Sequence, residues 1–418
     1  MCTVAVIFPG QGSQYIGMGK RDYDNYPIAR KIFDEVSSAV GMDMEDLCFR
    51  TGRQIINQTH YAQLTVFTAS ISMYSVLTQV YGITPCVVAG HSMGLCSALV
   101  ASGSISLTEM ARFIMVRGSV MQKMEYKQIG RMCAVGGVGI DKIHDCCAAI
   151  SSTGLFIDVS HYNTATQTVV AGDGLAMDLF IDAITNAGGK TTMISVLCPF
   201  HTPLMDPAAK ELVPFIEGLS INQPTYALLS CLDGLLLNTP EMIRRVLIAQ
   251  ITSPSRWVDV INGIINGGAQ TIIEVGPGRV LTNMLRGYEK NIEKIAFDDE
   301  KQRSLLLKTD HKAKLAGLLN NCLKHAVSTR NRNADNSQQS LEVTNSYKIL
   351  VNLQKNLYSY PDLTFINNTE EEAIRCIQII FDKKEVYGAE RNERIDEINR
   401  HRISNAYKPY ERSGEEVK

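Results

Sequence analysis

The sequence predicts an α/β protein in which helices cover a parallel sheet, with a smaller unit inserted into it and a helical extension at the C-terminus. Three observations support this fold class. Short, unbroken apolar runs alternate with helical patterns over the first hundred residues, which is typical of parallel strands buried on both faces. The order of elements changes over residues 128–199 and then reverts. Beyond residue 300 the chain is more polar and shows amphipathic helical patterns.

The predicted parallel sheet draws its strands from both sides of the insertion. Apolar runs predict buried strands at 3–8 and 85–90 before it, and at 226–234 and 271–276 after it. Between these runs, apolar residues at helical spacing predict helices at 61–81, 94–103, 106–124 and 241–251, and one that begins near Val280. We therefore expect one domain that comprises residues 1–127 and 200–300.

Residues 128–199 predict the inserted subdomain. Strands are expected at 131–138, 155–162, 166–172 and 190–197, and helices at 141–151 and 174–189. The resulting β-α-β-β-α-β order is the split βαβ, or ferredoxin-like, arrangement.

Residues 301–418 predict a linker and a C-terminal helical extension. The polar stretch 325–345 is typical of a linker, and helices are expected at 347–358 and 369–386. Thr369 and Glu372 have the spacing of a capping box, which would begin the second helix. Because the extension is highly charged and interrupted, we expect it to pack against the preceding domain or a partner rather than to form a second core.

Composition excludes several classes of protein. The formal net charge of −2, from 41 Lys and Arg against 43 Asp and Glu, argues against a strongly basic nucleic-acid-binding protein. No apolar run approaches the roughly 18–20 residues of a transmembrane helix, and the N-terminus lacks the basic segment of a signal peptide. We therefore expect a soluble, cytoplasmic protein that binds neither nucleic acid nor membrane. The 11 cysteines include no C-x-x-C pair, and we expect no metal or redox cofactor.

The pattern GHSMG at 90–94 is the strongest local signal for chemistry. It lies directly between a predicted strand and a predicted helix, as a nucleophile elbow requires. The turn would expose Ser92 Oγ and leave the backbone N–H of Met93 free to stabilise an oxyanion. An ordinary exposed serine in a glycine-rich turn is the alternative.

A serine nucleophile needs a base, and the chain has eight histidines. His201 lies in a short loop between a strand and a helix, where functional residues concentrate. His60, His144 and His161 remain alternatives, whereas His91 adjoins the serine and is expected to be structural. The triad of an ordinary esterase would run Ser, acid, His, with the histidine late in the chain. The late histidines here fall around or beyond the predicted linker: His311, His325 and His401.

Several motifs in register give the first 300 residues a specific resemblance. They are FPGQGSQ at 8–14, GHSMG at 90–94, VRG at 116–118, PFHTPLM at 199–205, the glutamine of AQITSPSRW at 249–257 and EVGPGRVL at 274–281. Together they resemble the malonyl-CoA:acyl-carrier-protein transacylases and the related acyltransferases of polyketide synthases. The resemblance implies an α/β-hydrolase-like domain with an inserted ferredoxin-like subdomain, in agreement with the pattern above.

The resemblance implies a role for each matching residue. Ser92 would be the nucleophile and His201 the base, oriented by the backbone carbonyl of Gln250. The backbone N–H groups of Gln11 and Met93 would form the oxyanion hole, with each donor contributing about 3 kcal/mol. Arg117 would bind the free carboxylate of malonate, because a guanidinium forms a bidentate, oriented ion pair. Gln63 and Phe200 would line the pocket.

The implied function is a ping-pong transfer of a malonyl-type unit from CoA, through Ser92, to the phosphopantetheine thiol of an acyl carrier protein. The sequence departs from the family at three positions that bear on specificity. The family usually has Glu and then an aromatic or aliphatic residue at Leu95 and Cys96, and it commonly has proline at Leu64. Phe200 resembles the residue at this position in polyketide acyltransferases that take malonyl. The extension resembles that of polyketide acyltransferases that act as separate proteins. We expect a monomer whose carrier could dock near Arg279, Arg286 and Lys290. An acyl hydrolase that clears carriers is the alternative enzyme, and a non-catalytic carrier scaffold is the other alternative.

Overall fold

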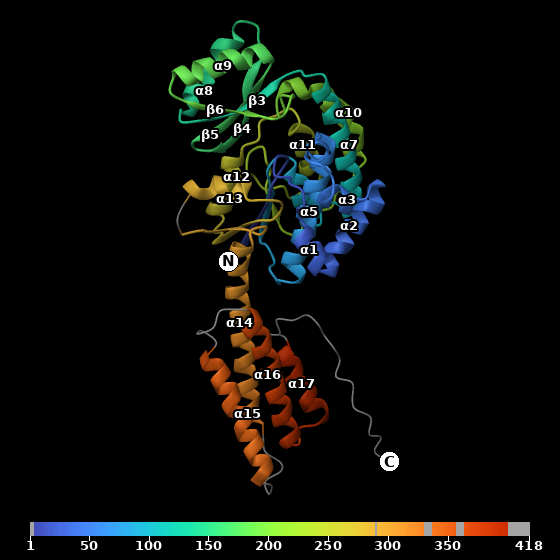
Figure 1. Ribbon diagram of the computed structural model, residues 1–418, viewed down its shortest axis with the longest axis vertical. Helices are drawn as coiled ribbons and strands as arrows, with labels where there is room; N and C mark the ends of the chain where they lie inside the picture. Colours follow the sequence, from blue (N-terminus) through green and yellow to red (C-terminus); the bar gives the residue numbers. More distant parts are fainter. Residues whose placement is uncertain (1–3, 289–290, 330–336, 357–362, 400–418) are drawn as a thin grey trace. The chain divides into compact units, whose positions relative to one another are not determined.

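The computed structural model describes residues 4–288, 291–329, 337–356 and 363–399. The chain divides into two compact units, residues 1–300 and 301–418. Unit 1 contains a five-stranded parallel sheet and a four-stranded antiparallel sheet, which confirms the predicted α/β class with an inserted subdomain (Figure 1). Within the described residues, no helix is both long and apolar enough to cross a membrane.

The parallel sheet has the strand order β7-β2-β1-β8-β9. Its central strand β1 (Val4–Phe8) pairs with β2 (Val87–Gly90) on one side and β8 (Thr271–Glu274) on the other. Alternate residues of β1 face opposite layers: Ala5 and Ile7 pack with the helix α12 (Trp257–Asn266), whereas Phe8 contacts Tyr74 of α5 (Thr59–Gln79). The central strands are therefore buried on both faces, as their unbroken apolar runs predict.

The two edge strands differ from the prediction. The strand predicted at 226–234 is limited to β7 (Ala227–Leu228), because the chain turns back and Ser230 N donates to Leu235 O. At the other edge, β9 (Glu293–Ala296) pairs with β8 and is absent from the prediction, since its apolar stretch is short and flanked by charges.

The remaining helices of unit 1 surround this sheet. A helical layer that contains α5 also includes α1 (Lys20–Asn25), α2 (Pro27–Val40), α3 (Met44–Phe49), α4 (Arg53–Ile56), α6 (Gly94–Ala101) and α7 (Leu107–Tyr126). After the insertion follow η1 (Pro203–Met205), α10 (Asp206–Glu217), α11 (Pro240–Ala249), α13 (Val280–Met284) and η2 (Leu285–Gly287).

The inserted subdomain has the strand order β4-β5-β3-β6, and all of its pairs are antiparallel. Its elements are β3 (Arg131–Gly136), α8 (Ile140–Ser151), β4 (Ile157–Thr164), β5 (Gln167–Gly172), α9 (Gly174–Asn186) and β6 (Lys190–Ile194). Residues of β3, β4 and β5 pack with both helices in a separate core. This is the predicted ferredoxin-like order of elements.

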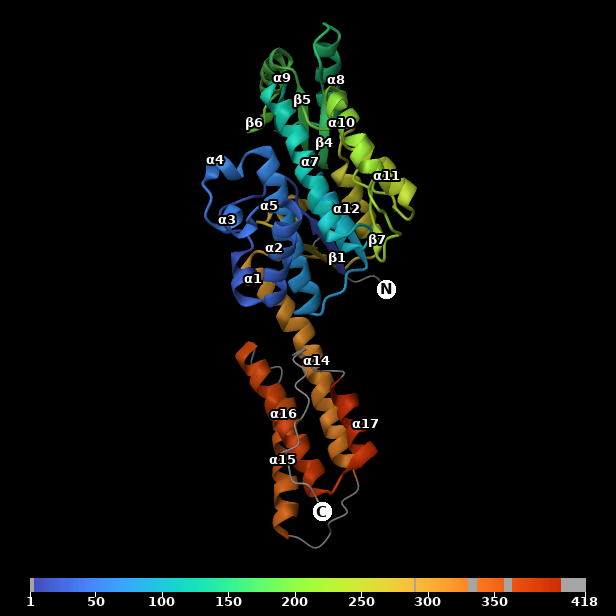
Figure 2. The same cartoon turned by 90° about the vertical axis from the view of Figure 1, so that its right-hand side faces the viewer.

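Unit 2 corrects the prediction for the extension. Its helices are α14 (Glu300–Ser328), α15 (Ser337–Asn356), α16 (Leu363–Lys383) and α17 (Gly388–Asn399), which Figure 2 shows side by side. The linker predicted at 325–345 is wrong wherever residues are described, because α14 and α15 occupy that stretch; residues 330–336 lie outside the described part. Thr369 is likewise inside α16 and buried, so it does not cap the helix.

Unit 2 also has its own core, contrary to the prediction. Apolar residues of all four helices form one buried cluster, which includes Leu318, Cys322, Leu350, Ile377 and Ile398. In α14 and α16 they recur at intervals of three and four residues, so each helix buries one stripe although its overall composition is polar. High charge on the remaining faces concealed this core in the sequence.

Candidate active site

The nucleophile elbow predicted at GHSMG is present between β2 and α6. Ser92 has φ 53°, a left-handed conformation that is rare for a residue with a side chain. The flanking glycines permit the tight turn: a Cβ atom on Gly90 would lie 2.0 Å from the Gly94 carbonyl carbon, and one on Gly94 would lie 2.2 Å from Phe8 O. The turn therefore requires glycine at both positions and presents Ser92 at the end of the sheet.

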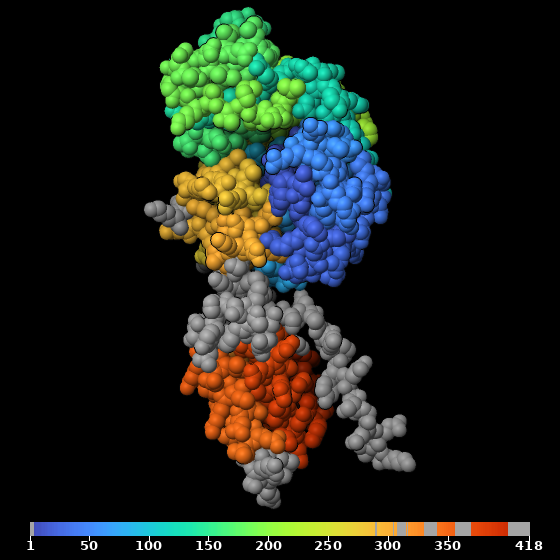
Figure 3. All heavy atoms as spheres, in the orientation of Figure 1, coloured from blue at the N-terminus to red at the C-terminus, as the bar shows by residue number. Residues whose placement is uncertain are grey.

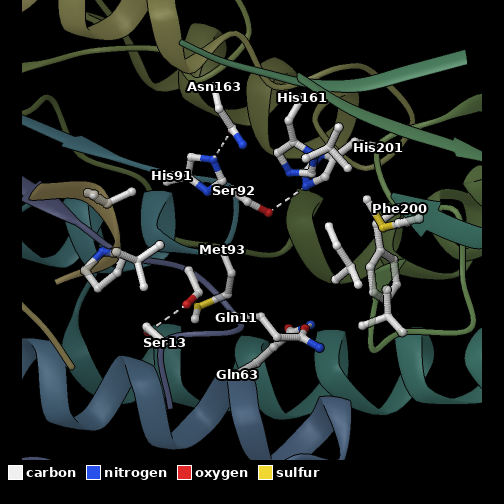
Figure 4. A pocket seen from close by; sticks show the side chains of 18 of the residues that line it. Gln11, Ser13, Gln63, His91, Ser92, Met93, His161, Asn163, Phe200 and His201 are labelled. Carbon is white, nitrogen blue, oxygen red and sulfur yellow. Dashed lines mark hydrogen bonds between the residues drawn. The ribbon is translucent and has the colours of Figure 1, made fainter. Parts of the chain in front are cut away.

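Ser92 and His201 form a hydrogen-bonded pair (Figure 4). Ser92 Oγ lies 2.6 Å from His201 Nε2, and His201 Nδ1 lies 2.6 Å from the carbonyl oxygen of Gln250. Because a carbonyl can only accept, Nδ1 carries the proton and Nε2 accepts from the serine hydroxyl. This is the tautomer that a general base requires, and the structure brings together all three residues predicted from the sequence.

The surroundings keep His201 uncharged. It is buried, and burial together with the positive charge of Arg117 lowers its pKa to about 3. At neutral pH the imidazole is therefore able to accept a proton.

Gln11 and Met93 line the same pocket as Ser92. The backbone just before Gln11 is close to the turn, since a Cβ atom on Gly10 would lie 3.6 Å from Met93 N and 2.6 Å from His91 O. The loop after β1 and the first residue after the serine thus flank Ser92, which is the arrangement that an oxyanion hole needs.

Arg117 is the most unusual residue of the pocket. Its side chain, from α7, is 1% exposed, and Nη1 donates to Gln63 Oε1 at 2.5 Å. Nε has no hydrogen-bond partner, and within the described residues no acidic side chain forms an ion pair with Arg117. Burial lowers its pKa. A buried guanidinium without a counter-charge is costly, so the pocket is suited to an anionic group.

A polar network extends from Arg117, Gln63 and Gln11 to two residues that the sequence did not indicate. Gln63 Nε2 donates to Gln11 Oε1 at 3.2 Å, and Gln11 Nε2 donates to Thr59 Oγ1 at 3.0 Å. Thr59 in turn donates to Glu125 Oε2 at 2.7 Å. Thr59 and Glu125 belong to different helices and carry no sequence signal, because only packing brings them together.

The three histidines that were alternatives to His201 as the base lie in different surroundings. His161 is buried beside His201, whereas His60 lies near Gln122 and His144 near Tyr162. His91 Nε2 lies 3.0 Å from Asn163 Oδ1, consistent with a structural role. Among the late histidines, His325 belongs to unit 2, nothing is described of the His311 side chain, and His401 lies outside the described residues.

The pocket has a volume of about 190 Å³, and besides the elbow, α5 and α7, three further parts of unit 1 line it. These are the loop after β1, the subdomain, and the segment around α13, which meet on one face in Figure 3. Phe200, 9% exposed, lines the wall next to His201, together with apolar residues that the sequence did not single out: Met121, Met132, Val169, Val196, Leu281 and Met284. Of the docking residues predicted outside the pocket, Arg279 pairs with Asp299 at 3.5 Å, and Lys290 lies outside the described residues.

Known proteins are similar to this chain in sequence and in fold. Residues 5–331 match the family described as acyl transferase domain. A malonyl CoA-acyl carrier protein transacylase of Bacillus subtilis is 29% identical over 92% of this chain and 98% of its own. Another, from Bacillus subtilis strain 168, is 31% identical over 74% of this chain and 98% of its own.

A solved structure resembles unit 1. It is a malonyl-transacylase in complex with the acyl carrier protein of a type II polyketide synthase, and it is 30% identical with a TM-score of 0.69. The similarity covers 72% of this chain and 97% of that one. The chain belongs to the malonyl CoA-acyl carrier protein transacylase family of acyltransferases.

Proposed function

We propose that this chain transfers a malonyl group from CoA to the phosphopantetheine thiol of an acyl carrier protein, through an ester on Ser92. The observation that carries the choice of malonyl is Arg117, a buried cation without an acidic partner in the described residues, in the same pocket as the Ser92–His201 pair. The free carboxylate of a malonyl thioester would form a bidentate ion pair with it. An acetyl thioester would leave the charge uncompensated.

In each half-reaction His201 accepts the proton of the attacking group and returns it to the leaving group. Ser92 Oγ attacks the thioester carbonyl while its proton passes to His201 Nε2, and the oxyanion is bound by the N–H groups of Gln11 and Met93. The C–S bond then breaks, and His201 returns the proton to the departing CoA thiolate. The carrier thiol gives its proton to His201 and attacks the ester in the same way, which regenerates Ser92. The Gln250 carbonyl orients the imidazole throughout.

We further propose that the carrier belongs to a polyketide or hybrid polyketide–peptide assembly line. The supporting observations are the additional unit 2 and the solved relative whose partner is a polyketide carrier. A panel of holo carrier proteins from polyketide and fatty-acid systems, compared by the rate of malonyl transfer, tests this point. Preference for the fatty-acid carrier would contradict it.

The central test is labelling of the enzyme with radioactive malonyl-CoA. We expect one labelled site at Ser92 and no label on Ser92→Ala. His144→Phe, a change of an exposed histidine outside the pocket, is the matched control and should label normally. Label on Ser92→Ala would contradict the proposal, and rapid release of free malonate without a carrier would favour an acyl hydrolase.

A further inference from the structure

His161 is a buried histidine of the active site that has no step in the proposed reaction. It lies on β4 of the subdomain, and its ring centre is 4.6 Å from that of His201, with 77° between the ring planes. Its other side stacks on His91, with 5.2 Å between the centres and 10° between the planes. Figure 4 shows His161 and His201 next to each other above Ser92. The subdomain therefore contacts the proposed base directly.

Hydrogen bonds connect His161 to the backbone that precedes His201. Ser160 Oγ donates to the carbonyl oxygen of Phe200 at 2.9 Å. Because its only proton is used there, Ser160 Oγ accepts from His161 Nδ1, which lies at 2.7 Å. His201 itself has φ 59°, a strained conformation that persists only where the surroundings enforce it.

The segment that carries His161 is joined to the loop that orients His201. A register irregularity in β4 lies between Val159 and His161, and there the strand pairs with Ser255. Ser255 N donates to Ser160 O at 2.9 Å, and Tyr162 N donates to Ser255 O at 2.8 Å. Ser255 follows closely on Gln250, whose carbonyl accepts from His201 Nδ1. The backbone pairing between residues 160–162 and Ser255 thus connects the two segments that contact the His201 imidazole, the one with His161 and the one with Gln250.

We propose that His161 is a positioning residue: its ring, and its hydrogen bond through Ser160 to the Phe200 carbonyl, hold the His201 imidazole in line with Ser92. This inference rests on the proposed roles of Ser92 and His201. No proton transfer is assigned to His161, since its Nδ1–H is held by Ser160 and Ser92 Oγ is hydrogen-bonded to His201 Nε2.

The charged and titratable groups around His201 predict a pH signature. His91 faces it from the turn before α6, Arg117 from α7 and His161 from β4, while Gln250 and Ser253 offer backbone groups after α11. Burial is the main cause that lowers the pKa of His201. Removal of the His161 ring admits water beside the imidazole, so the pKa of His201 rises and the acid limb of kcat/KM moves to higher pH.

The experiment compares His161→Ala, His161→Phe, Ser160→Ala and the control His144→Phe in the full chain. We measure the rate of malonyl-enzyme formation, KM for malonyl-CoA and the pH profile. His161→Ala should lower kcat about 10²-fold, because misplacement of a catalytic group by about 1 Å has that effect. Its KM should change less than twofold, and its acid limb should move up. His161→Phe keeps the ring bulk and should lose less, without the pH shift.

A double-variant cycle separates the positioning role from a general loss of folding. Since His161 and Ser160 act along one path, the double variant His161→Phe with Ser160→Ala should be no slower than the slower single variant. Additive losses, a change in KM alone, or wild-type rates and pH profiles would each overturn the inference. If the wild-type enzyme forms no ester on Ser92, the proposed function fails. If the wild-type enzyme forms the ester and the His161 variants form it at the same rate with the same pH profile, only the inference about His161 fails. Should His161→Ala not fold, the other two variants carry the test.

Discussion

At the scale of single residues, the reacting pair is defined by backbone conformation as well as by side chains. Among the described non-glycine residues, positive φ occurs at Ser92, Gln128, His201 and Glu385. Such a conformation costs on the order of 1–3 kcal/mol, so surrounding contacts must hold it. For His201 these contacts include Thr202 Oγ1, which donates to Pro199 O at 2.6 Å. The geometry of the pair is therefore imposed by the fold around it.

The first prediction concerns selectivity at Arg117. We expect Arg117→Gln to lower kcat/KM for malonyl-CoA by about 10²-fold or more, as loss of one partner of a buried charge pair costs roughly 2–5 kcal/mol. Loading from acetyl-CoA should be retained or rise, because no cation is left uncompensated. Arg117→Lys should fall between, since an ammonium lacks the bidentate geometry. The measurement is the ratio of kcat/KM for the two donors, with Arg112→Gln, an exposed arginine of the same helix, as the control. An equal loss for both donors would contradict the role.

The second prediction concerns stability against pH. Burial lowers the pKa of His91, His161 and His201, the last to about 3, from an ordinary value near 6.5. Well above pH 6.5 neither the folded nor the unfolded state protonates these rings, so they leave stability unchanged. Below it the unfolded state binds protons that the folded state does not, so stability falls by up to about 1.4 kcal/mol per pH unit for each ring.

Urea denaturation of the intact protein at pH 7.5, 6 and 5 measures this effect. The free energy of unfolding of unit 1 should decrease steadily toward pH 5, and His161→Phe should show a shallower decrease. A free energy of unfolding that is constant across this range would contradict the prediction.

At the scale of elements, the segment EVGPGRVL at 274–281 explains how one wall of the pocket is built. Glu274 ends β8, is fully buried, and accepts from Leu281 N at 2.9 Å and Thr282 N at 2.7 Å. It thereby satisfies N–H groups that the short helix α13 leaves free in its first turn. A Cβ atom on Gly276, which has φ 147°, would lie 2.5 Å from Ser70 Oγ. The turn and the carboxylate together place α13 against the active site.

The third prediction follows from this cap. We expect Glu274→Ala to lower the free energy of unfolding by about 2–3 kcal/mol, because it leaves buried N–H groups without an acceptor. The KM for malonyl-CoA should rise as well, since Leu281 and Met284 line the pocket. Chemical denaturation and steady-state kinetics measure the two effects. Glu293→Ala, at an exposed position of the edge strand β9, is the control and should change neither.

At the scale of the whole molecule, the proposed active site belongs to one of the two units. Every residue that lines the active-site pocket belongs to unit 1. Unit 2 has a separate buried core. Lys384, directly after α16, donates to the carbonyls of Ala326, in the last turn of α14, and of Thr329, just after that helix. The malonyl transacylase of strain 168 aligns with only 74% of this chain, whereas the other Bacillus relative aligns with 92%. Only one of these two relatives therefore aligns over most of unit 2 as well as unit 1.

The fourth prediction tests this division. Residues 1–300 alone should fold and should form the malonyl ester at a rate within about threefold of the full chain, because the pocket and both sheets are intact. Circular dichroism and malonyl-CoA labelling measure the two properties. Loss of labelling by a folded 1–300 fragment would show that unit 2 is needed for the first half-reaction.

The residues proposed for the active site could largely be named from the sequence, because they lie in short motifs. A strand followed by GHSMG defines Ser92, and the resemblance supplied Gln11, Arg117, His201 and Gln250 in register. His161, Thr59 and Glu125 acquire their places only through contacts between elements distant in sequence, so no local pattern identifies them. The same holds for β9, an edge strand without a strong apolar run.

The sequence by itself determined the α/β class and the inserted subdomain, because hydrophobic period and turn chemistry are local properties. Its motifs also marked Ser92 as a candidate nucleophile, and the family resemblance supplied the other proposed site residues. Only the tertiary structure decided that residues beyond 300 form a core of their own, because a buried stripe on a polar helix becomes a core when other helices cover it. It likewise decided that Arg117 has no acidic partner among the described residues and that His161 contacts the base. Burial and distance between side chains depend on the whole fold, and these two quantities determine the chemistry of the site.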